Sequence, residues 1–136
     1  MEHAVKFIGE IHSVLRRMED CPLQESENAP EAEIMVFPEY LEGIKDLVGR
    51  PEILLLTWLH MADRTVIKCH PRRNKEAPEL GVFSTRSPSR PNPVGVHYVK
   101  VLSVAENGLI RVSGLEAIDG TPVIDIKPVW EDDHII

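Results

Sequence analysis

The sequence has few residues that could cross-link the chain or bind a metal. It contains 2 cysteines in 136 residues, and Cys21 and Cys69 form no Cys-x-x-Cys pair and have no histidine at a zinc-ligand spacing. The 6 histidines stand singly along the chain. This pattern argues against a disulfide framework and indicates no metal site, so we expect two buried or incidental thiols and no bound metal.

Long apolar runs and the usual glycine-rich motifs are also missing. No apolar segment approaches the roughly 20 residues of a membrane-spanning helix, and the first residues, Met-Glu-His-Ala-Val-Lys, lack the build of a secretory signal. The sequence contains no Gly-x-Gly-x-x-Gly, no P-loop and no Gly-x-Ser-x-Gly. We therefore expect a cytoplasmic protein that uses neither a Rossmann site nor a serine-hydrolase elbow.

What is present predicts one all-β domain over residues 1–136. A hydrophobic content of 43% allows an ordinary core in a chain of this length. The expected strands span residues 5–11, 31–37, 53–59, 94–104, 109–115 and 123–127. Many short strands with turns between them are typical of a barrel or sandwich.

Local patterns predict further details of these elements. The apolar run 53–59 is typical of a central strand that is buried on both faces, and Asn107-Gly108 between two strand-like runs favours a type I′ hairpin. Residues 41–48 place apolar side chains at helical spacing before Gly49, which predicts one short helix or 3-10 turn. Residues 17–30 are polar and interrupted by prolines, so we expect a loop that can serve as a mobile flap.

Charge is distributed unevenly along the chain. The formal net charge of −7 argues against indiscriminate binding of nucleic acid. Residues 62–100 nevertheless contain 8 basic and 3 acidic residues, a net charge of +5, and the rest of the chain therefore carries −12. Such a basic segment suits a polyanion if the fold gathers it on one side. The alternative is a solvated loop of arginines and lysines.

The segment from Gly81 to Gly95 carries the strongest functional signal. It reads Gly-Val-Phe-Ser-Thr-Arg-Ser-Pro-Ser-Arg-Pro-Asn-Pro-Val-Gly, and its three prolines leave it little conformational freedom to lose on binding. The guanidinium groups of Arg86 and Arg90 can each offer paired donors to a carboxylate or phosphate. The segment predicts a stiff loop for an anionic or planar polar ligand, with an ordinary proline-rich surface loop as the alternative.

Two long motifs resemble the TrmO (TsaA-like) family of tRNA methyltransferases. One is the segment 81–95, and the other runs from Gly114 to Pro128 as Gly-Leu-Glu-Ala-Ile-Asp-Gly-Thr-Pro-Val-Ile-Asp-Ile-Lys-Pro. Weaker similarity between Phe7 and Arg64 extends the resemblance over nearly the whole chain. The resemblance implies a small β-barrel with one or two short helices, dimeric, that binds S-adenosylmethionine without a Rossmann fold. It also implies methylation of N6 of threonylcarbamoyladenosine at position 37, in the tRNA anticodon loop.

The resemblance also assigns residues to the site. For the cofactor it implies His60, Met61, Arg86, Val96, Glu116, Ala117, Ile118 and Asp119. Arg86 would orient the carboxylate of the cofactor, and Asp119 would pair with its amine or ribose. The expected RNA contacts are Arg72 and Arg73 of the basic segment, together with Arg90 and Asn92, which could instead shape the pocket.

The residue that accepts a proton during the reaction is not identified by the sequence. His60 and Asp119 are the candidates, and a water molecule is the alternative. Asp119 can also be a turn carboxylate that caps the Asp-Gly-Thr-Pro bend, and His60 can be a hydrogen-bonded histidine at the rim.

Two departures from the family pattern keep other functions open. Residues 29–32 read Ala-Pro-Glu-Ala, where many relatives carry Pro-Arg-Gln, so an acid replaces a cation near the expected cofactor entrance. The chain also ends soon after Pro128, without the extra C-terminal domain of longer relatives. The main alternative is a module that binds S-adenosylmethionine or RNA without methyl transfer, and a third is an RNA-binding barrel that takes no cofactor.

Overall fold

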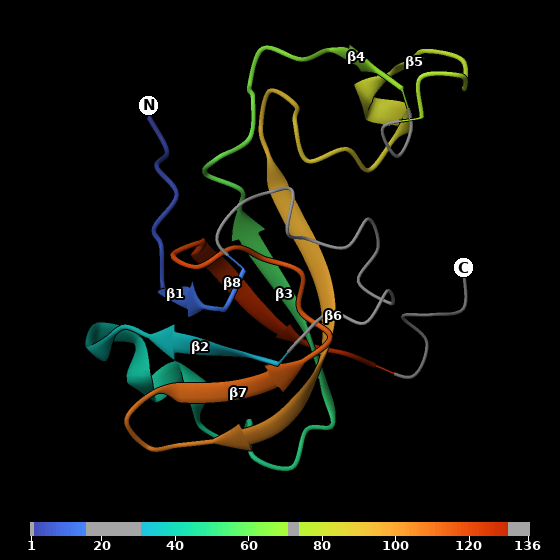
Figure 1. Cartoon of the computed structure of the whole chain (residues 1–136). Helices are drawn as coiled ribbons and strands as arrows, with labels where there is room; N and C mark the ends of the chain where they lie inside the picture. Colours follow the sequence, from blue (N-terminus) through green and yellow to red (C-terminus); the bar gives the residue numbers. More distant parts are fainter. Residues whose placement is uncertain (1, 16–30, 71–73, 131–136) are drawn as a thin grey trace.

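The computed structural model describes residues 2–15, 31–70 and 74–130. Six strands close into an antiparallel barrel in the order β1-β2-β7-β6-β3-β8, and β4 and β5 form a separate two-stranded sheet (Figure 1). The strands are β1 (Gly9–His12), β2 (Ala32–Val36), β3 (Glu52–Trp58), β4 (Lys68–Cys69), β5 (Leu80–Gly81), β6 (Val94–Val104), β7 (Leu109–Ser113) and β8 (Pro122–Pro128). The expected all-β barrel is confirmed.

The core fills the inside of the barrel, because alternate side chains of each strand point inward. On β3 the inward residues Ile53, Leu55 and Thr57 are buried, and the residues between them are half-buried. The prediction that residues 53–59 are buried on both faces is therefore wrong: a barrel strand has one face inside and one outside. The core cluster consists of Ile11, Ala32, Ile34, Val36, Ile53, Leu55, Val99, Ile110, Val112, Leu115, Ala117 and Val123.

The hairpin between β6 and β7 differs from the predicted type I′ turn. The backbone N–H of Gly108 donates to the carbonyl of Ala105 at 3.0 Å, and Ala105 N–H donates to Leu109 O at 2.9 Å. Gly108 has a φ of +98°, whereas Asn107 is not among the described residues with positive φ. A type I′ turn needs positive φ at both central residues, so this loop is instead a four-residue turn, residues 105–108, whose last residue is the left-handed Gly108.

The remaining predicted elements agree with the structure to different degrees. Strands β2, β6 and β8 lie where they were expected, whereas β1 begins only at Gly9. The predicted short helix is present as the 3-10 helix η2 (Pro38–Ile44), but it begins before the expected range 41–48 and ends at Ile44 rather than at Gly49. Gly49 follows it with a φ of +90°. The predicted flap 17–30 lies outside the described residues, and no helix in the described part of the chain is long and apolar enough to cross a bilayer.

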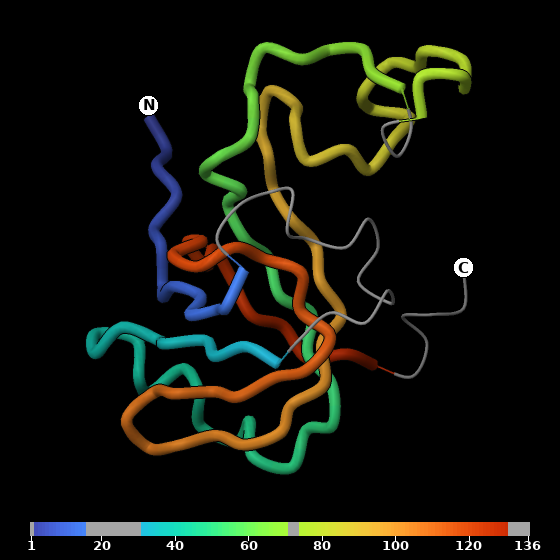
Figure 2. The backbone as a smooth tube through the Cα atoms, in the orientation of Figure 1, coloured from blue at the N-terminus to red at the C-terminus, as the bar shows by residue number. Residues whose placement is uncertain are grey.

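A long excursion between β3 and β6, residues 59–93, is the feature that positions the site; we call it the arm. It contains β4, β5 and the 3-10 helix η4 (Val82–Ser84). The trace in Figure 2 leaves the barrel after β3, projects beyond it and returns at the start of β6. The base of the arm is joined by a hydrogen bond of 2.8 Å from Leu59 N–H to Pro93 O.

Candidate functional site

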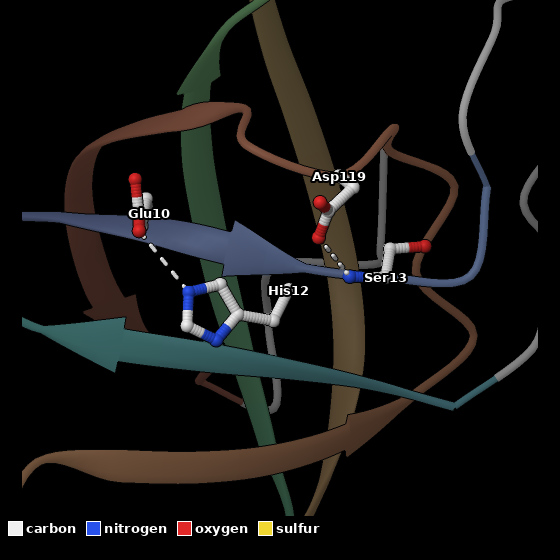
Figure 3. A network of polar contacts seen from close by, with 4 residues as sticks. All are labelled: Glu10, His12, Ser13 and Asp119. Carbon is white, nitrogen blue, oxygen red and sulfur yellow. Dashed lines mark hydrogen bonds and ion pairs between the residues drawn. The ribbon is translucent and has the colours of Figure 1, made fainter.

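The segment that connects β7 to β8 is fixed against the end of β1. Oδ1 of Asp119 accepts a hydrogen bond of 2.9 Å from the backbone N–H of Ser13 (Figure 3), and the backbone N–H of Asp119 donates to Leu15 O at 2.7 Å. The next residue, Gly120, donates its N–H to Ile11 O at 2.7 Å. Asp119 therefore has a structural role, since it joins two segments that lie 106 residues apart in sequence.

A hollow of about 410 Å³ opens beside Asp119. Its lining consists of His12, Ser13, Val14, Glu31, Ala32, Glu33, Arg111 and Asp119. At its edge, Nε2 of His12 lies 3.1 Å from Oε1 of Glu10 (Figure 3). A volume of this size is in the range of small-molecule sites, and the polar groups on its walls can orient a ligand.

The acid at position 31 is paired within this hollow. Nη2 of Arg111 donates to Oε1 of Glu31 at 2.7 Å, and both side chains are about half exposed. Arg111 is also the cross-strand neighbour of Glu33. Glu31, the acid expected to stand in place of a cation, is therefore compensated by a guanidinium and does not leave a lone negative charge at the hollow.

Two other predicted cofactor residues of this segment have buried side chains. Ala117 and Ile118 are 3% and 8% exposed, and Ala117 belongs to the barrel core. Glu116 is half-buried. A ligand beside this segment can therefore reach Glu116 and Asp119, which are half-buried, but not Ala117 and Ile118, which are buried between them.

On the arm, Arg90 points into its own loop. Its Nε donates to Ser87 O at 2.9 Å, and its Nη2 donates to the carbonyls of Val82, at 2.8 Å, and Thr85. Three backbone carbonyls that would otherwise face one another are thereby bound to one cation. The two roles left open for Arg90 are contact with RNA and shaping of the pocket, and these contacts favour the second because they fix the loop from within.

Arg86 is placed differently from Arg90 on the same loop. Its side chain is exposed, and within residues 2–15, 31–70 and 74–130 its guanidinium has no hydrogen-bond or ion-pair partner. The loop around it is held by Arg90 and by three prolines. Arg86 is therefore presented to solvent with its donors available for a carboxylate or phosphate.

The remaining predicted cofactor residues lie near the base of the arm. His60 and Met61 are exposed in the turn after β3, where Ala62 N–H donates to Leu59 O at 3.0 Å. Val96 lies on β6 opposite Leu56 and is 44% exposed. The apolar Met61 and Val96 can contact the apolar portion of a ligand, and His60 can donate or accept a hydrogen bond there.

The sequence analysis did not identify Arg64 and Trp58 as site residues. The Cζ atom of Arg64 lies 5.0 Å from the centroid of a Trp58 ring. Its Nε donates to Pro91 O at 2.7 Å and its Nη2 to Oδ1 of Asn92 at 3.3 Å. The predicted RNA residue Asn92 is therefore bound within the arm. The signal that could have identified Arg64 was its place in the weaker family similarity between Phe7 and Arg64.

Asp63, beside Arg64, has a perturbed acidity. Its Oδ1 accepts hydrogen bonds from the hydroxyl and from the backbone N–H of Thr65, at 2.6 and 2.8 Å. These bonds, the hydroxyl first, favour the ionised form and hold the pKa of Asp63 below its ordinary value of 3.8. The carboxylate is therefore ionised at neutral pH and belongs to the local fold of the arm.

The predicted site falls into two parts within one chain. The arm carries His60 and Met61 on its outgoing half, close in sequence to Arg64, and Arg64 contacts Asn92 on the returning half. No described residue of the arm lines the hollow beside Asp119, and in Figure 1 the segment around η4 lies well away from the connection between β7 and β8. Arg72 and Arg73 lie outside the described residues.

Comparison of the sequence with known proteins gives close relatives. The family model described as the tRNA-methyltransferase O N-terminal domain matches residues 10–133. A probable S-adenosyl-L-methionine-binding protein of Methanothermobacter thermautotrophicus is 44% identical over 132 residues, which is 97% of this chain and 93% of that protein. An S-adenosyl-L-methionine-binding protein of Archaeoglobus fulgidus is 41% identical over 123 residues, with 90% and 86% of the two chains covered.

Solved structures with the same fold are similar over the whole chain. The crystal structure of TrmO from Pseudomonas aeruginosa superposes with a TM-score of 0.79 at 29% identity, and the match covers 100% of this chain and 60% of that one. Another TrmO crystal structure has a TM-score of 0.80 at 31% identity, with 100% and 61% covered. The chain thus spans about three fifths of the length of these two structures.

Proposed function

We propose a function for this chain from the premise that it belongs to the tRNA-methyltransferase O N-terminal domain family. The chain is an S-adenosylmethionine-dependent methyltransferase that acts on tRNA. The observation that carries this proposal is the family match over residues 10–133, joined with relatives at 44% and 41% identity that are described as binding this cofactor or probably binding it.

The residues present fit the groups of S-adenosylmethionine. Arg86 offers free guanidinium donors for its carboxylate, and Asp119 offers a carboxylate for its amine or ribose. Exposed Met61 and Val96 provide apolar contacts beside His60. When bound, the cofactor supplies an electrophilic methyl group; the chain's part is to align it with the acceptor nitrogen and to exclude competing geometries.

We place the substrate in the tRNA anticodon loop and the reacting atom at N6 of threonylcarbamoyladenosine 37. An exocyclic adenine nitrogen is a weak nucleophile, so alignment and a proton acceptor are both needed. His60 is the better candidate for this acceptor, because Oδ1 of Asp119 is engaged by Ser13. Lys68 and Lys75, which are exposed on the arm, are available to anticodon-loop phosphates.

A homodimer joins the two parts of the site. The arm exposes large apolar side chains, with Phe83, Ile67 and Met61 at 83%, 64% and 63% exposure, and such side chains are typical of a surface that is covered in an assembly. In the proposed dimer the arm of one protomer lies against the Asp119 hollow of its partner. Arg86 and Asp119 then act on one cofactor from different chains.

Complementation between two variants tests this arrangement directly. Arg86→Ala and Asp119→Asn are each expected to lose methyl transfer, and a mixture of refolded or co-expressed protomers is expected to regain part of it, because half of the sites in a mixed dimer are intact. Lys45→Ala, which removes an exposed cation outside the arm, is the control for loss of a positive charge. No recovery in a verified mixed dimer would place both residues in one chain or exclude one of them from the site.

The second candidate function is a module that binds the cofactor without transferring its methyl group. The relatives from archaea favour it, because they are described only as binding or probably binding S-adenosyl-L-methionine. Methyl-labelled S-adenosylmethionine and tRNA with or without threonylcarbamoyladenosine separate the two functions. Label on the modified tRNA alone supports the enzyme, binding without label on either tRNA supports the module, and the absence of binding rejects both.

A further inference from the structure

One side chain, that of Arg64, contacts both halves of the arm's base. Its guanidinium lies over Trp58, with 5.0 Å between Cζ and the ring centroid. The same guanidinium donates from Nε to Pro91 O at 2.7 Å and from Nη2 to Oδ1 of Asn92 at 3.3 Å. One planar cation therefore contacts the end of β3, where the arm leaves the barrel, and the residues just before β6, where it returns.

A second contact from the neighbouring residue supports this junction. The backbone N–H of Asp63 donates to Oγ of Ser89 at 3.2 Å, and the carboxylate of Asp63 fixes its own turn through Thr65. The outgoing half of the arm is thus locally rigid where it meets the loop that carries the arginines. Arg64 and Asp63 together hold residues 89–92 in one place.

The junction formed by Arg64 and Asp63 affects the placement of three residues of the proposed cofactor site: His60, Met61 and Arg86. His60 and Met61 lie in the short loop that is closed when Arg64 stacks on Trp58. Arg86 lies four residues before Arg90, in the loop whose backbone carbonyls Arg90 binds. Arg64 binds Pro91, a later residue of the same loop. A substitution of Arg64 therefore changes the position of the loop that carries His60 relative to the loop that carries Arg86.

We propose that Arg64 is a positioning residue of the cofactor site: it holds the His60-Met61 turn and the arginine loop in the relative geometry in which both contact the ligand. This inference rests on the proposed function. A lysine cannot replace it, because an ammonium group lacks both the planar face that stacks on Trp58 and the fork that reaches two acceptors. Pre-organisation of this kind reduces the cost of ordering a site when a ligand binds.

Calorimetric titration with S-adenosylmethionine of the full chain tests the proposal. Arg64→Lys is expected to raise the dissociation constant about tenfold, as the loss of a pre-organised pair of hydrogen bonds implies. The matched control is Arg50→Lys, because Arg50 makes the same kind of contact, with Cζ 5.3 Å from a Trp130 ring, but does so before β3 and away from the arm. The control is expected to bind like the wild type.

A double-mutant cycle separates positioning from a general loss of stability. If Arg64 acts through the arginine loop, Arg86→Ala costs less affinity in the Arg64→Lys background than in the wild type, whereas unrelated effects add. Additive losses, or an unchanged dissociation constant for Arg64→Lys, would overturn the inference and leave the proposed function intact. Failure of the wild type to bind S-adenosylmethionine would overturn both. If Arg64→Lys does not fold, Trp58→Phe weakens the same stacking and is judged by the same criteria.

Discussion

The hydroxyl oxygen of Thr57 lies 2.8 Å from Nε2 of His97, and this buried pair fits inside the barrel because residue 95 is glycine. Thr57 and His97 are 0% and 5% exposed. A Cβ atom at residue 95 would lie 2.4 Å from the Thr57 hydroxyl and 2.7 Å from His97 Nε2. Gly95, opposite Thr57 on β3, has no side chain and therefore leaves room for the Thr57–His97 hydrogen bond next to the base of the arm.

Gly95→Ala is expected to destabilise the fold by about 1–3 kcal/mol, as over-packing of a filled core does. The added methyl group must displace the Thr57 hydroxyl or the His97 ring, and either movement weakens their hydrogen bond. Chemical denaturation measures the change. Gly43→Ala is the control, since a Cβ there meets no atom within 4 Å, and equal stability of the two variants would contradict the packing argument.

Arg90 and Arg86 are expected to respond oppositely to substitution by alanine. Arg90→Ala leaves three carbonyls of the loop without their cation, and loss of such bonds costs about 1–3 kcal/mol of local stability, seen as faster amide hydrogen exchange in residues 80–92. Arg86→Ala should leave this exchange unchanged and reduce binding of S-adenosylmethionine. If amide protection in residues 80–92 is lost in both variants, or in neither, the two arginines do not divide the roles of holding the loop and binding the ligand.

The acidity of Asp63 is expected to depend on Thr65. The hydroxyl and backbone N–H of Thr65 hold the pKa of Asp63 below 3.8, so this carboxylate stabilises the fold above its unfolded pKa, and that contribution is lost as pH falls through its lower folded pKa. Thr65→Val removes the larger of the two causes and should raise the pKa of Asp63 toward 3.8. An NMR titration measures it, and an unshifted carboxyl resonance curve would refute the assignment.

Two substitutions of Asp119 are expected to differ in their effects on the stability of the fold and on ligand binding. Asp119→Asn keeps an oxygen that can accept from the Ser13 N–H, so the free energy of unfolding should change little, while binding of a cationic ligand group weakens. Asp119→Ala also removes the acceptor and should cost a further ~1 kcal/mol. Thermal or chemical denaturation beside a binding measurement separates these effects. Equal stability losses in both variants would indicate that the charge, rather than the Ser13 bond, holds this segment.

Several elements of the fold could be read from the sequence because their signals are local. Strands β2, β6 and β8 follow β-rich segments bounded by prolines, glycines or turns, and η2 (Pro38–Ile44) overlaps only the first part of the helical spacing expected over residues 41–48. The sequence predicted the position of the Asn107-Gly108 turn correctly, but the predicted turn type, I′, was wrong. Its left-handed residue is Gly108 alone, whose Cβ would meet Val36 O at 2.8 Å, and that neighbour comes from a strand distant in sequence.

The sequence predicted less of the candidate site than of the fold. The arginine-rich and Asp-Gly-Thr-Pro motifs both identified the family, but they could not say which guanidinium faces a ligand. Arg86 and Arg90 lie in the same kind of sequence, and only the folded loop gives Arg90 its carbonyl partners. Likewise, Glu31 reads as an unpaired acid until Arg111 is placed beside it across two strands.

By itself, the sequence determined the class of fold, the family and the presence of a stiff arginine-bearing loop, because alternation, turn residues and long motifs are properties of neighbouring positions. The tertiary structure decided which residues are free to bind and which hold the arm together. Arg64 and Asp119 obtain backbone partners from other segments, and Arg90 obtains its partners from the folded backbone of its own loop. The positions of those atoms exist only after the barrel and the arm have folded.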